Sequence, residues 1–334
     1  MTSREIVRRC IEFRDPPRVA WHFRTDPVDG RVWDETDFAG VSCAADPGFV
    51  RKPGQNEWGD EWGVRKRTLT TQVGEAVGFP LADGWHLLED YRFPDFEAPW
   101  RWEGFGEKVA AGHAAGRYVY AAIPTLMQLP ANLRGMENWF ADNLLEKENL
   151  ARLLDRIVEI RAGIIERYAA AGVDGVITYD DMGTNDRTLV SPDTFRELYL
   201  PRYRATVDLL HQRGMHFIHH CCGQVRELMD MIVEAGCDVI QLDQPTLMGI
   251  EWLGGNYAGR ICFWNCVDIQ TTMNGEDLGA IEAEAREQVR HLGGRRGGFM
   301  VKAYQQPESI GLTVEKVDRQ YRAFVKCGSR PPDS

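Results

Sequence analysis

Residues 215–243 read MHFIHHCCGQVRELMDMIVEAGCDVIQLD, and this stretch contains the pattern that decides the fold. A short apolar run at 215–219 ends in polar residues. An amphipathic stretch at 225–235 follows, and a second apolar run at 239–242 ends at Asp243. Short strand-forming runs that alternate with longer helical stretches are typical of a parallel sheet covered by helices.

The same alternation extends over most of the chain. Further strands are predicted at 18–23, 118–123, 176–179, 260–264 and 298–301, and further helices at 138–171, from 191 onward, at 278–292 and at 312–325. At least seven strands are therefore visible. An eighth could lie in 24–107, a region rich in Trp, Pro, Gly and Asp that we expect to be an irregular elaboration on the scaffold. We predict an α/β fold, a (β/α)8 TIM barrel over 1–334 as a single domain, because no glycine-rich nucleotide motif follows an early strand as in an open doubly wound sheet.

The composition is that of an ordinary globular protein, with 43% hydrophobic and 27% charged residues. There are 39 basic and 50 acidic residues, which gives a net charge of −11. Such a balance argues against nucleic acids and anionic membranes as partners, because both attract clustered Lys and Arg. No apolar run approaches the roughly 20 residues needed to cross a bilayer, and the first 14 residues lack the apolar core of a secretory signal. Eight cysteines in such a chain favour a reducing, cytoplasmic location, in which clustered cysteines point to metal or redox chemistry.

Polar residues gather at the carboxyl ends of five predicted strands. They are Tyr179-Asp180-Asp181, His219-His220-Cys221-Cys222-Gly223, Leu242-Asp243-Gln244, Asn265-Cys266-Val267-Asp268 and Lys302-Ala303-Tyr304-Gln305-Gln306. In a barrel these ends converge on one mouth, which is where such folds place their active sites. Five endings of this kind in succession predict an enzyme. The structural alternative is that they are ordinary polar caps of loops.

The strongest chemical signal is the run HHCCG at 219–223. Residues two apart on an extended strand point to the same side, so His220 and Cys222 can both face the mouth and hold one ion. Imidazole nitrogen and thiolate sulfur are zinc ligands, and a catalytic zinc takes three protein ligands and keeps one position open. We therefore predict a zinc site with His220 and Cys222 as ligands. Cys266, which follows a nearby strand, is the first candidate for the third ligand.

Three alternatives stay open at this point. In the other strand register, His219 and Cys221 would face the mouth. Gly223 permits a tight turn over the barrel rim, and this favours the residues nearest to it as mouth-facing. The third ligand could also be Cys262 or Asp181. The cysteines could instead be small apolar residues of the core.

Carboxylates and proton donors at the other strand ends supply further candidates. Asp180 and Asp181 follow an apolar strand, so one should face the mouth and the other a neighbouring strand. Either Asp180 or Asp181 could act as a general base or bind a cationic substrate group, unless it caps the following turn, and the same alternatives apply to Asp243. Asp181 and Asp243 are the predicted catalytic carboxylates. Lys302 and Tyr304 could donate hydrogen bonds to an anionic substrate, although Lys302 could simply pair with a nearby aspartate.

Six segments share their order and spacing with one known group of proteins. They are Asp60-Glu61-Trp62-Gly63 and residues 80–94, 133–145, 179–192, 220–223 and 297–317. On these segments, which span most of residues 57–325, the chain resembles the uroporphyrinogen decarboxylase superfamily. This superfamily consists of (β/α)8 barrels and also contains the zinc-dependent methyltransferases of corrinoid pathways. The resemblance implies the same fold for this chain, and a homodimer is common among such proteins.

The resemblance also separates two branches of the superfamily. The true decarboxylases carry an arginine-rich segment after the first strand, whereas the sequence here is Trp21-His22-Phe23-Arg24-Thr25, with one arginine. The methyltransferases carry His-x-Cys-Gly and a later cysteine as zinc ligands. Residues 220–223 fit the first motif, but 302–306, where the later cysteine is expected, contain none. The methyltransferase branch is therefore favoured, with Cys266 as the substitute for the later cysteine.

These observations predict a zinc-dependent methyltransferase that moves a methyl group between a corrinoid, or a methylated small molecule, and a thiol or cobalt acceptor. One alternative is a cofactor-free decarboxylase of the uroporphyrinogen decarboxylase type. Another is a non-catalytic protein that binds a corrinoid or a tetrapyrrole. The expected partners are a small-molecule substrate and a corrinoid carrier protein.

Overall fold

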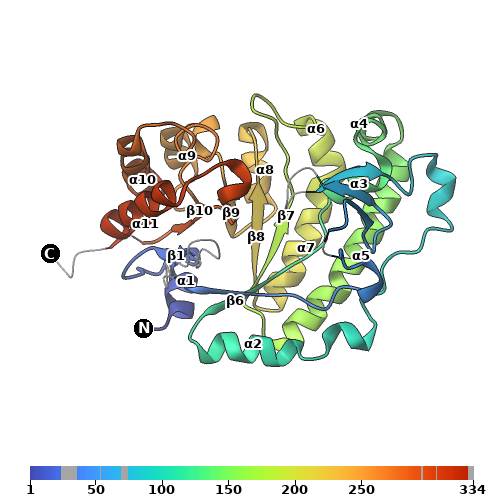
Figure 1. The fold of residues 1–334 in the computed structure, drawn as a ribbon, viewed down its shortest axis with the longest axis horizontal. Helices are drawn as coiled ribbons and strands as arrows, with labels where there is room; N and C mark the ends of the chain where they lie inside the picture. The colour runs from blue at the N-terminus through green and yellow to red at the C-terminus, as the bar shows by residue number, and fades with distance from the viewer. Residues whose placement is uncertain (24–35, 53, 69–73, 295, 306, 330–334) are drawn as a thin grey trace.

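Eight parallel strands form the central sheet, in the order β1-β11-β10-β9-β8-β7-β6-β2 (Figure 1). The computed structural model describes residues 1–334 except 24–35, 53, 69–73, 295, 306 and 330–334. The strands are β1 (Ala20–His22), β2 (Phe38–Val41), β6 (Tyr118–Ala122), β7 (Gly175–Tyr179), β8 (His216–Cys221), β9 (Val239–Leu242), β10 (Cys262–Asn265) and β11 (Phe299–Lys302). The seven strands that the sequence predicts are all present. The eighth, β2, lies in the Trp-rich region, so the prediction of a (β/α)8 barrel is confirmed.

The barrel closes between β1 and β2, the two ends of this strand order. The Asp37 N–H donates to the carbonyl of Trp21 at 2.9 Å, and the Asp37 carboxylate accepts the Trp21 N–H at 2.8 Å. Arg18 holds the same carboxylate with two hydrogen bonds of 2.7 Å each. One buried aspartate therefore joins the first strand to the second.

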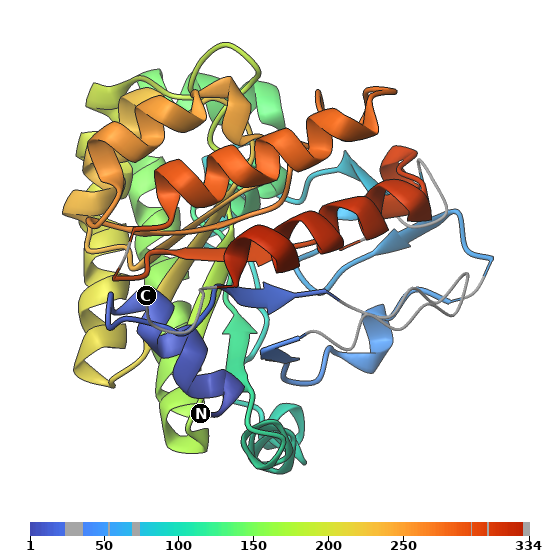
Figure 2. The same cartoon turned by 90° about the vertical axis from the view of Figure 1, so that its left-hand side faces the viewer.

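Helices surround the sheet (Figures 1 and 2). They are α1 (Ser3–Ile11), α2 (Phe105–Ala114), α3 (Gln128–Arg134), α4 (Met136–Leu145), α5 (Lys147–Ala171), α6 (Pro192–Thr194), α7 (Leu200–Gln212), α8 (Met229–Glu234), α9 (Ile250–Tyr257), α10 (Leu278–Leu292) and α11 (Val314–Gly328). The single helix predicted at 138–171 is two helices, because the backbone leaves the helical conformation at Glu146. No helix in the described part of the chain is both long and apolar enough to cross a membrane.

The barrel interior is filled at its amino-terminal end by helix α1. Ile6, Val7 and Ile11 pack against inward-facing strand residues such as Ile218 and Trp264. Two hydrogen bonds place α1 at this end, because Arg4 N–H donates to the carbonyl of Gly116 just before β6, and Gly298 N–H, just before β11, donates to Cys10. The opposite end, where the strands finish, forms the mouth.

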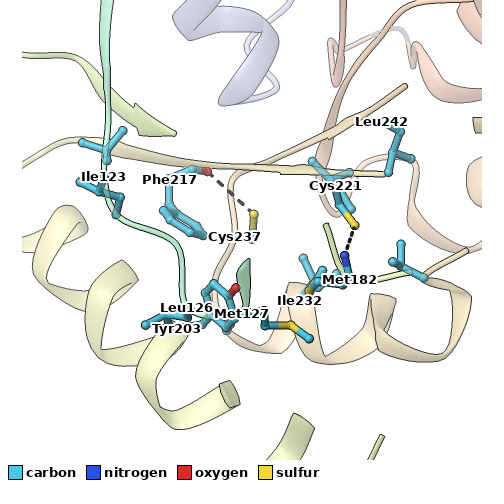
Figure 3. Close-up of a cluster of buried hydrophobic side chains, with 14 of the residues drawn as sticks. Ile123, Leu126, Met127, Met182, Tyr203, Phe217, Cys221, Ile232, Cys237 and Leu242 are labelled. Carbon is cyan, nitrogen blue, oxygen red and sulfur yellow. Dashed lines mark hydrogen bonds between the residues drawn. The ribbon is translucent and has the colours of Figure 1, made fainter. Parts of the chain in front are cut away.

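Outward-facing strand residues pack against the helices in a second apolar layer. Figure 3 shows part of it, in which Phe217 and Cys221 of β8 lie with Leu242 of β9, Met182 and Ile232. Along β8 the side chains therefore alternate, as expected for a strand. Ile218 points into the barrel and its neighbour Phe217 points out.

The region between β2 and α2 contains a separate antiparallel sheet. Its strands are β3 (Glu57–Gly59), β4 (Arg65–Thr68) and β5 (Gly74–Gly78). Arg101, which is 2% exposed, ties the surrounding loops together. Its guanidinium donates to Glu61 at 2.5 Å and to the carbonyl groups of Asp95 and Ala44 at 2.7 and 3.0 Å. One buried cation thus links residues 44, 61 and 95 of this region.

Candidate functional site

A cavity of about 290 Å³ lies at the carboxyl ends of β7, β8, β9 and β11. It is lined by Tyr179, Asp181, His220, Cys222, Gln241, Asp243, Lys302, Tyr304 and Gln305. All of the predicted site residues except Cys266 are therefore gathered in one place. A larger hollow of about 630 Å³ lies outside the barrel, between residues 88–97 and α5. Its arginines are paired with exposed glutamates, so the mouth is the better candidate site.

The register of β8 selects the pair that faces the mouth. Ile218 lies inside the barrel, so His220, two positions on, also points inward and lines the cavity with Cys222. Cys221 points outward, and its sulfur accepts the Met182 N–H at 3.3 Å (Figure 3). His219 is buried against the Tyr203 ring, and this burial lowers the pKa of His219 to about 4. The structure thus places the pair His220 and Cys222 at the mouth.

Asp181, His220 and Cys222 form a compact group of possible metal ligands. One donor atom from each lies within 4.8 Å of the other two. His220 Nε2 is 3.6 Å from Cys222 Sγ and 3.6 Å from Asp181 Oδ1. Two ligands of a tetrahedral zinc, at bond lengths of about 2.0–2.3 Å, are roughly 3.4–3.6 Å apart. The separations from His220 Nε2 to the sulfur and to the carboxylate oxygen therefore fit two pairs of ligands of one zinc ion.

Burial shifts the pKa values of His220 and Cys222 in opposite directions. Burial, followed by the nearby Asp181 charge, raises the pKa of Cys222 well above that of an ordinary thiol. Burial lowers the pKa of His220, which favours the neutral imidazole. A neutral imidazole is the form that binds metals. A divalent cation would stabilise the Cys222 thiolate, so metal binding there would release a proton.

Two glycines bring Asp181 and Cys222 close to each other. Gly223 has φ +87°, and a Cβ there would lie 2.2 Å from the carbonyl oxygen of Gly183. A Cβ on Gly183 would in turn lie 2.4 Å from the carbonyl oxygen of Gln224. The two backbones therefore pass in direct contact, and the Cys222 N–H donates to Asp181 at 2.8 Å. The tight turn expected at Gly223 is present.

Asp180 does not face the mouth. It is completely buried, and its carboxylate accepts the backbone N–H groups of Leu126, Met127 and Gln128 at 2.7–3.0 Å. It also accepts a hydrogen bond from the Tyr203 hydroxyl. Asp180 therefore has a structural role, as one alternative for this pair expects, but it caps the loop that starts α3 and not the turn that follows it.

Asp243 and Lys302 form a buried ion pair beside the metal-ligand group. Their charged atoms are 2.5 Å apart, with side chains 2% and 5% exposed. Burial alone would lower the pKa of Lys302 and raise that of Asp243. Their mutual attraction outweighs burial, so the pKa of Lys302 is raised and that of Asp243 is lowered. An anionic substrate would thus meet a lysine that is already neutralised, as the sequence-based alternative for Lys302 suggests.

The remaining predicted residues take different places. Cys266 is completely buried, and its sulfur lies 3.5 Å from Asp243 Oδ1, outside the group formed by Asp181, His220 and Cys222. Tyr304 lies on the cavity wall, and burial raises its pKa, so the phenol carries its proton at neutral pH. Arg24, the one arginine in the segment where the decarboxylases are rich in arginine, lies outside the described residues.

Gln241 is a site residue that sequence reasoning missed. It is 2% exposed, and its carboxamide oxygen lies 2.9 Å from His220 Nδ1 and 3.1 Å from Lys302 Nζ. The available signal was a polar residue within the apolar run of β9, two positions before Asp243 and hence on the same side of the strand.

The fold and the site define a (β/α)8 barrel protein with a possible metal site at its mouth. Residues 124–298, more than half of the chain, match the sequence model described as uroporphyrinogen decarboxylase (URO-D). The chain belongs to this family, so the sequence-based prediction of family is confirmed.

The chain is also similar to two individual proteins. A curated relative named uroporphyrinogen decarboxylase, from Syntrophotalea carbinolica, is 26% identical over 179 residues. The match covers 52% of this chain and 49% of that protein, so the chain spans about half of the relative's length. The solved structure of a methyltransferase from Methanosarcina mazei superposes with a TM-score of 0.61 at 15% identity. The match covers 80% of this chain and 76% of the methyltransferase chain, and the two chains share the same fold.

Proposed function

We propose that this chain is a zinc-dependent methyltransferase of the uroporphyrinogen decarboxylase family. It would move a methyl group between a corrinoid, or a methylated small molecule, and a thiol or cobalt acceptor. The observation that carries the proposal is the convergence of Asp181, His220 and Cys222 within 4.8 Å at the cavity. A zinc ion held there would supply a Lewis acid that lowers the pKa of a substrate thiol or polarises a methylated oxygen or nitrogen.

The other lining residues would bind and orient the small molecule. The Tyr304 hydroxyl and the Gln305 amide can donate hydrogen bonds to it, and Tyr179 offers an aromatic wall. Among the described residues of the lining, Lys302 is the sole cation, and Asp243 neutralises it. A neutral or weakly charged substrate group therefore suits the site better than a set of free carboxylates.

The volume of the cavity suits the small-molecule partner of the reaction and is too small for a corrinoid. The 290 Å³ cavity adjoins a hollow of about 220 Å³ over β2 and β6, and the two share Tyr179 and Gln305. Volumes at the lower end of the range for ligand pockets suit a small molecule. A corrinoid is much larger, so it would dock on the rim, either free or on a carrier protein.

In the thiol-accepting direction the reaction balances without a further reagent. The sulfur–carbon bond forms as the cobalt–carbon bond breaks. Both electrons of that bond stay on cobalt, which goes from Co(III) to Co(I), and the thiol proton is released to solvent. The name of the Methanosarcina mazei structure supports methyl transfer, whereas the name of the curated relative makes decarboxylation the competing reaction.

Metal analysis and a methyl-transfer assay test the proposal. We expect about one zinc ion per chain, and zinc-dependent methylation of a small thiol by methylcobalamin, followed by the change in cobalt absorbance. A chelator should abolish the transfer, and added zinc should restore it. Release of CO₂ from uroporphyrinogen that survives the chelator would instead support the decarboxylase. Corrinoid binding without turnover of any thiol would support the non-catalytic binding protein.

Asp181 is expected to contribute more to zinc affinity than Cys266. Asp181→Ala should weaken zinc binding roughly tenfold, a modest effect because this carboxylate is partly exposed and solvent screens its charge. Cys266→Ala should leave zinc affinity within about threefold of the wild type, because this sulfur lies outside the donor group. Competition with a chromophoric chelator measures both. If Cys266→Ala loses zinc affinity and Asp181→Ala does not, Cys266 is the third ligand.

A further inference from the structure

Gln241 connects the buried ion pair to the metal-ligand group. Its carboxamide oxygen lies 3.1 Å from Lys302 Nζ. An ammonium group has only donors, so the atom of Gln241 that faces it must be the acceptor oxygen and not the amide nitrogen. Lys302 is itself fixed by Asp243 at 2.5 Å. The orientation of the Gln241 carboxamide is therefore determined by its surroundings.

This orientation decides which nitrogen of His220 carries the proton. His220 Nδ1 lies 2.9 Å from the same Gln241 oxygen, so Nδ1 must be the N–H donor. In a neutral imidazole the other nitrogen, Nε2, then has a free lone pair. Nε2 is the atom that lies 3.6 Å from Cys222 Sγ and from Asp181 Oδ1. The lone pair is thus located where a metal ion would bind.

We propose that Gln241 is a positioning residue for the metal site: held by Lys302, its oxygen keeps His220 in the tautomer whose Nε2 faces Cys222 and Asp181. Histidine ligands of metals commonly donate their second N–H to such a partner. The proposal rests on the proposed zinc site, but it also concerns the metal-free protein. It gives the buried pair of Asp243 and Lys302 a role that does not require contact with substrate.

A neutral carboxamide suits this position better than a carboxylate would. Asp243 already balances the charge of Lys302, and both are almost completely buried. A second buried carboxylate would have no further cation among the described residues that line the cavity. Glutamine supplies an acceptor oxygen for both donors and adds no charge.

The tautomer of His220 in the metal-free protein is the first test. Nitrogen-15 NMR of the histidine rings, with His220→Ala to assign the signal, should show the proton on Nδ1 in the wild type. In Gln241→Leu, which keeps the volume and removes the acceptor, the proton should move wholly or partly to Nε2. A wild type with its proton on Nε2, or a Gln241→Leu variant with an unchanged signal, would overturn the proposal.

Zinc affinity, measured by chelator competition, is the second test. Gln241→Leu should bind zinc roughly 10- to 100-fold more weakly than the wild type. Gln241→Leu with wild-type affinity would contradict the proposal. Gln305→Leu, which changes a glutamine that lines the same cavity from the segment after β11, is the matched control. The visible spectrum of the cobalt(II)-substituted protein should change in Gln241→Leu and not in Gln305→Leu.

A replacement variant and the metal-free measurement allow failure of this inference to be distinguished from failure of the proposed function. If Gln241→Leu does not fold, Gln241→Asn replaces it, because its shorter side chain withdraws the oxygen from His220 Nδ1 but remains polar. If wild-type protein binds no zinc, the proposed function fails, but the tautomer measurement still tests Gln241. If wild-type protein binds zinc and the tautomer is insensitive to Gln241, this inference alone fails.

Discussion

Cys222→Ala is expected to lose zinc, whereas Cys221→Ala is expected to keep it. The two cysteines are adjacent in the chain and face opposite sides of the sheet. Cys222 lines the cavity beside His220, and Cys221 packs in the outer layer against Met182 (Figure 3). Zinc sites bind with about 10–16 kcal/mol, so losing one of about four ligands should cost roughly 3 kcal/mol, or about 100-fold in affinity.

The Cys221→Ala variant should show a different defect. It removes a buried sulfur atom and an acceptor for the Met182 N–H, so the free energy of unfolding should fall by about 1–2 kcal/mol with zinc affinity unchanged. Chelator competition and urea denaturation separate the two effects. If Cys221→Ala loses zinc and Cys222→Ala retains it, the assignment of the mouth-facing pair is wrong.

Asp180→Ala is expected to be the most destabilising substitution near the site. The change leaves the N–H groups of residues 126–128 and the Tyr203 hydroxyl without their acceptor. Arg161, which is completely buried beside Tyr203, also loses the attraction of the Asp180 charge. Removing one member of such a buried charged network costs roughly 3–5 kcal/mol.

The neighbouring aspartate is a matched control for this experiment. The Asp181 side chain is 41% exposed, so Asp181→Ala should change the free energy of unfolding of the metal-free protein by only about 1 kcal/mol. Asp180→Asn, which keeps the shape and one acceptor oxygen, should lie between the two alanine variants. Equal stability of Asp180→Ala and Asp181→Ala in urea denaturation would contradict the structural role assigned to Asp180.

The strands were predicted most accurately where a polar residue lies at each end of a short apolar run. The run 239–242, between Asp238 and Asp243, coincides with β9. β2 could not be located in advance, because four residues inside a region rich in Trp, Pro and Gly carry too little periodicity. The break at Glu146 was missed for a related reason, since apolar spacing does not distinguish one long helix from two that meet end to end.

Within the candidate site, the sequence predicted only the positions of residues relative to others on the same strand. His220 and Cys222 are two positions apart on one strand, so their common direction could be inferred. The proximity of Asp181 depends on the register of β7 and β8, which pairs Tyr179 with His220 and brings the next inward residues opposite each other. The contact from Lys302 to Gln241 joins β11 to β9, two strands apart, and depends on the stagger of the whole barrel.

Among the described residues, α1 fills the amino-terminal end of the barrel, which leaves the mouth as the route to the site. Since the far end is filled by Ile6, Val7 and their neighbours, a methyl donor and a methyl acceptor would have to come and go by the same route. A bulky corrinoid seated on the rim would cover that route. The small molecule would then have to enter first and leave last, so steady-state kinetics should follow a compulsory order of binding and not a random one.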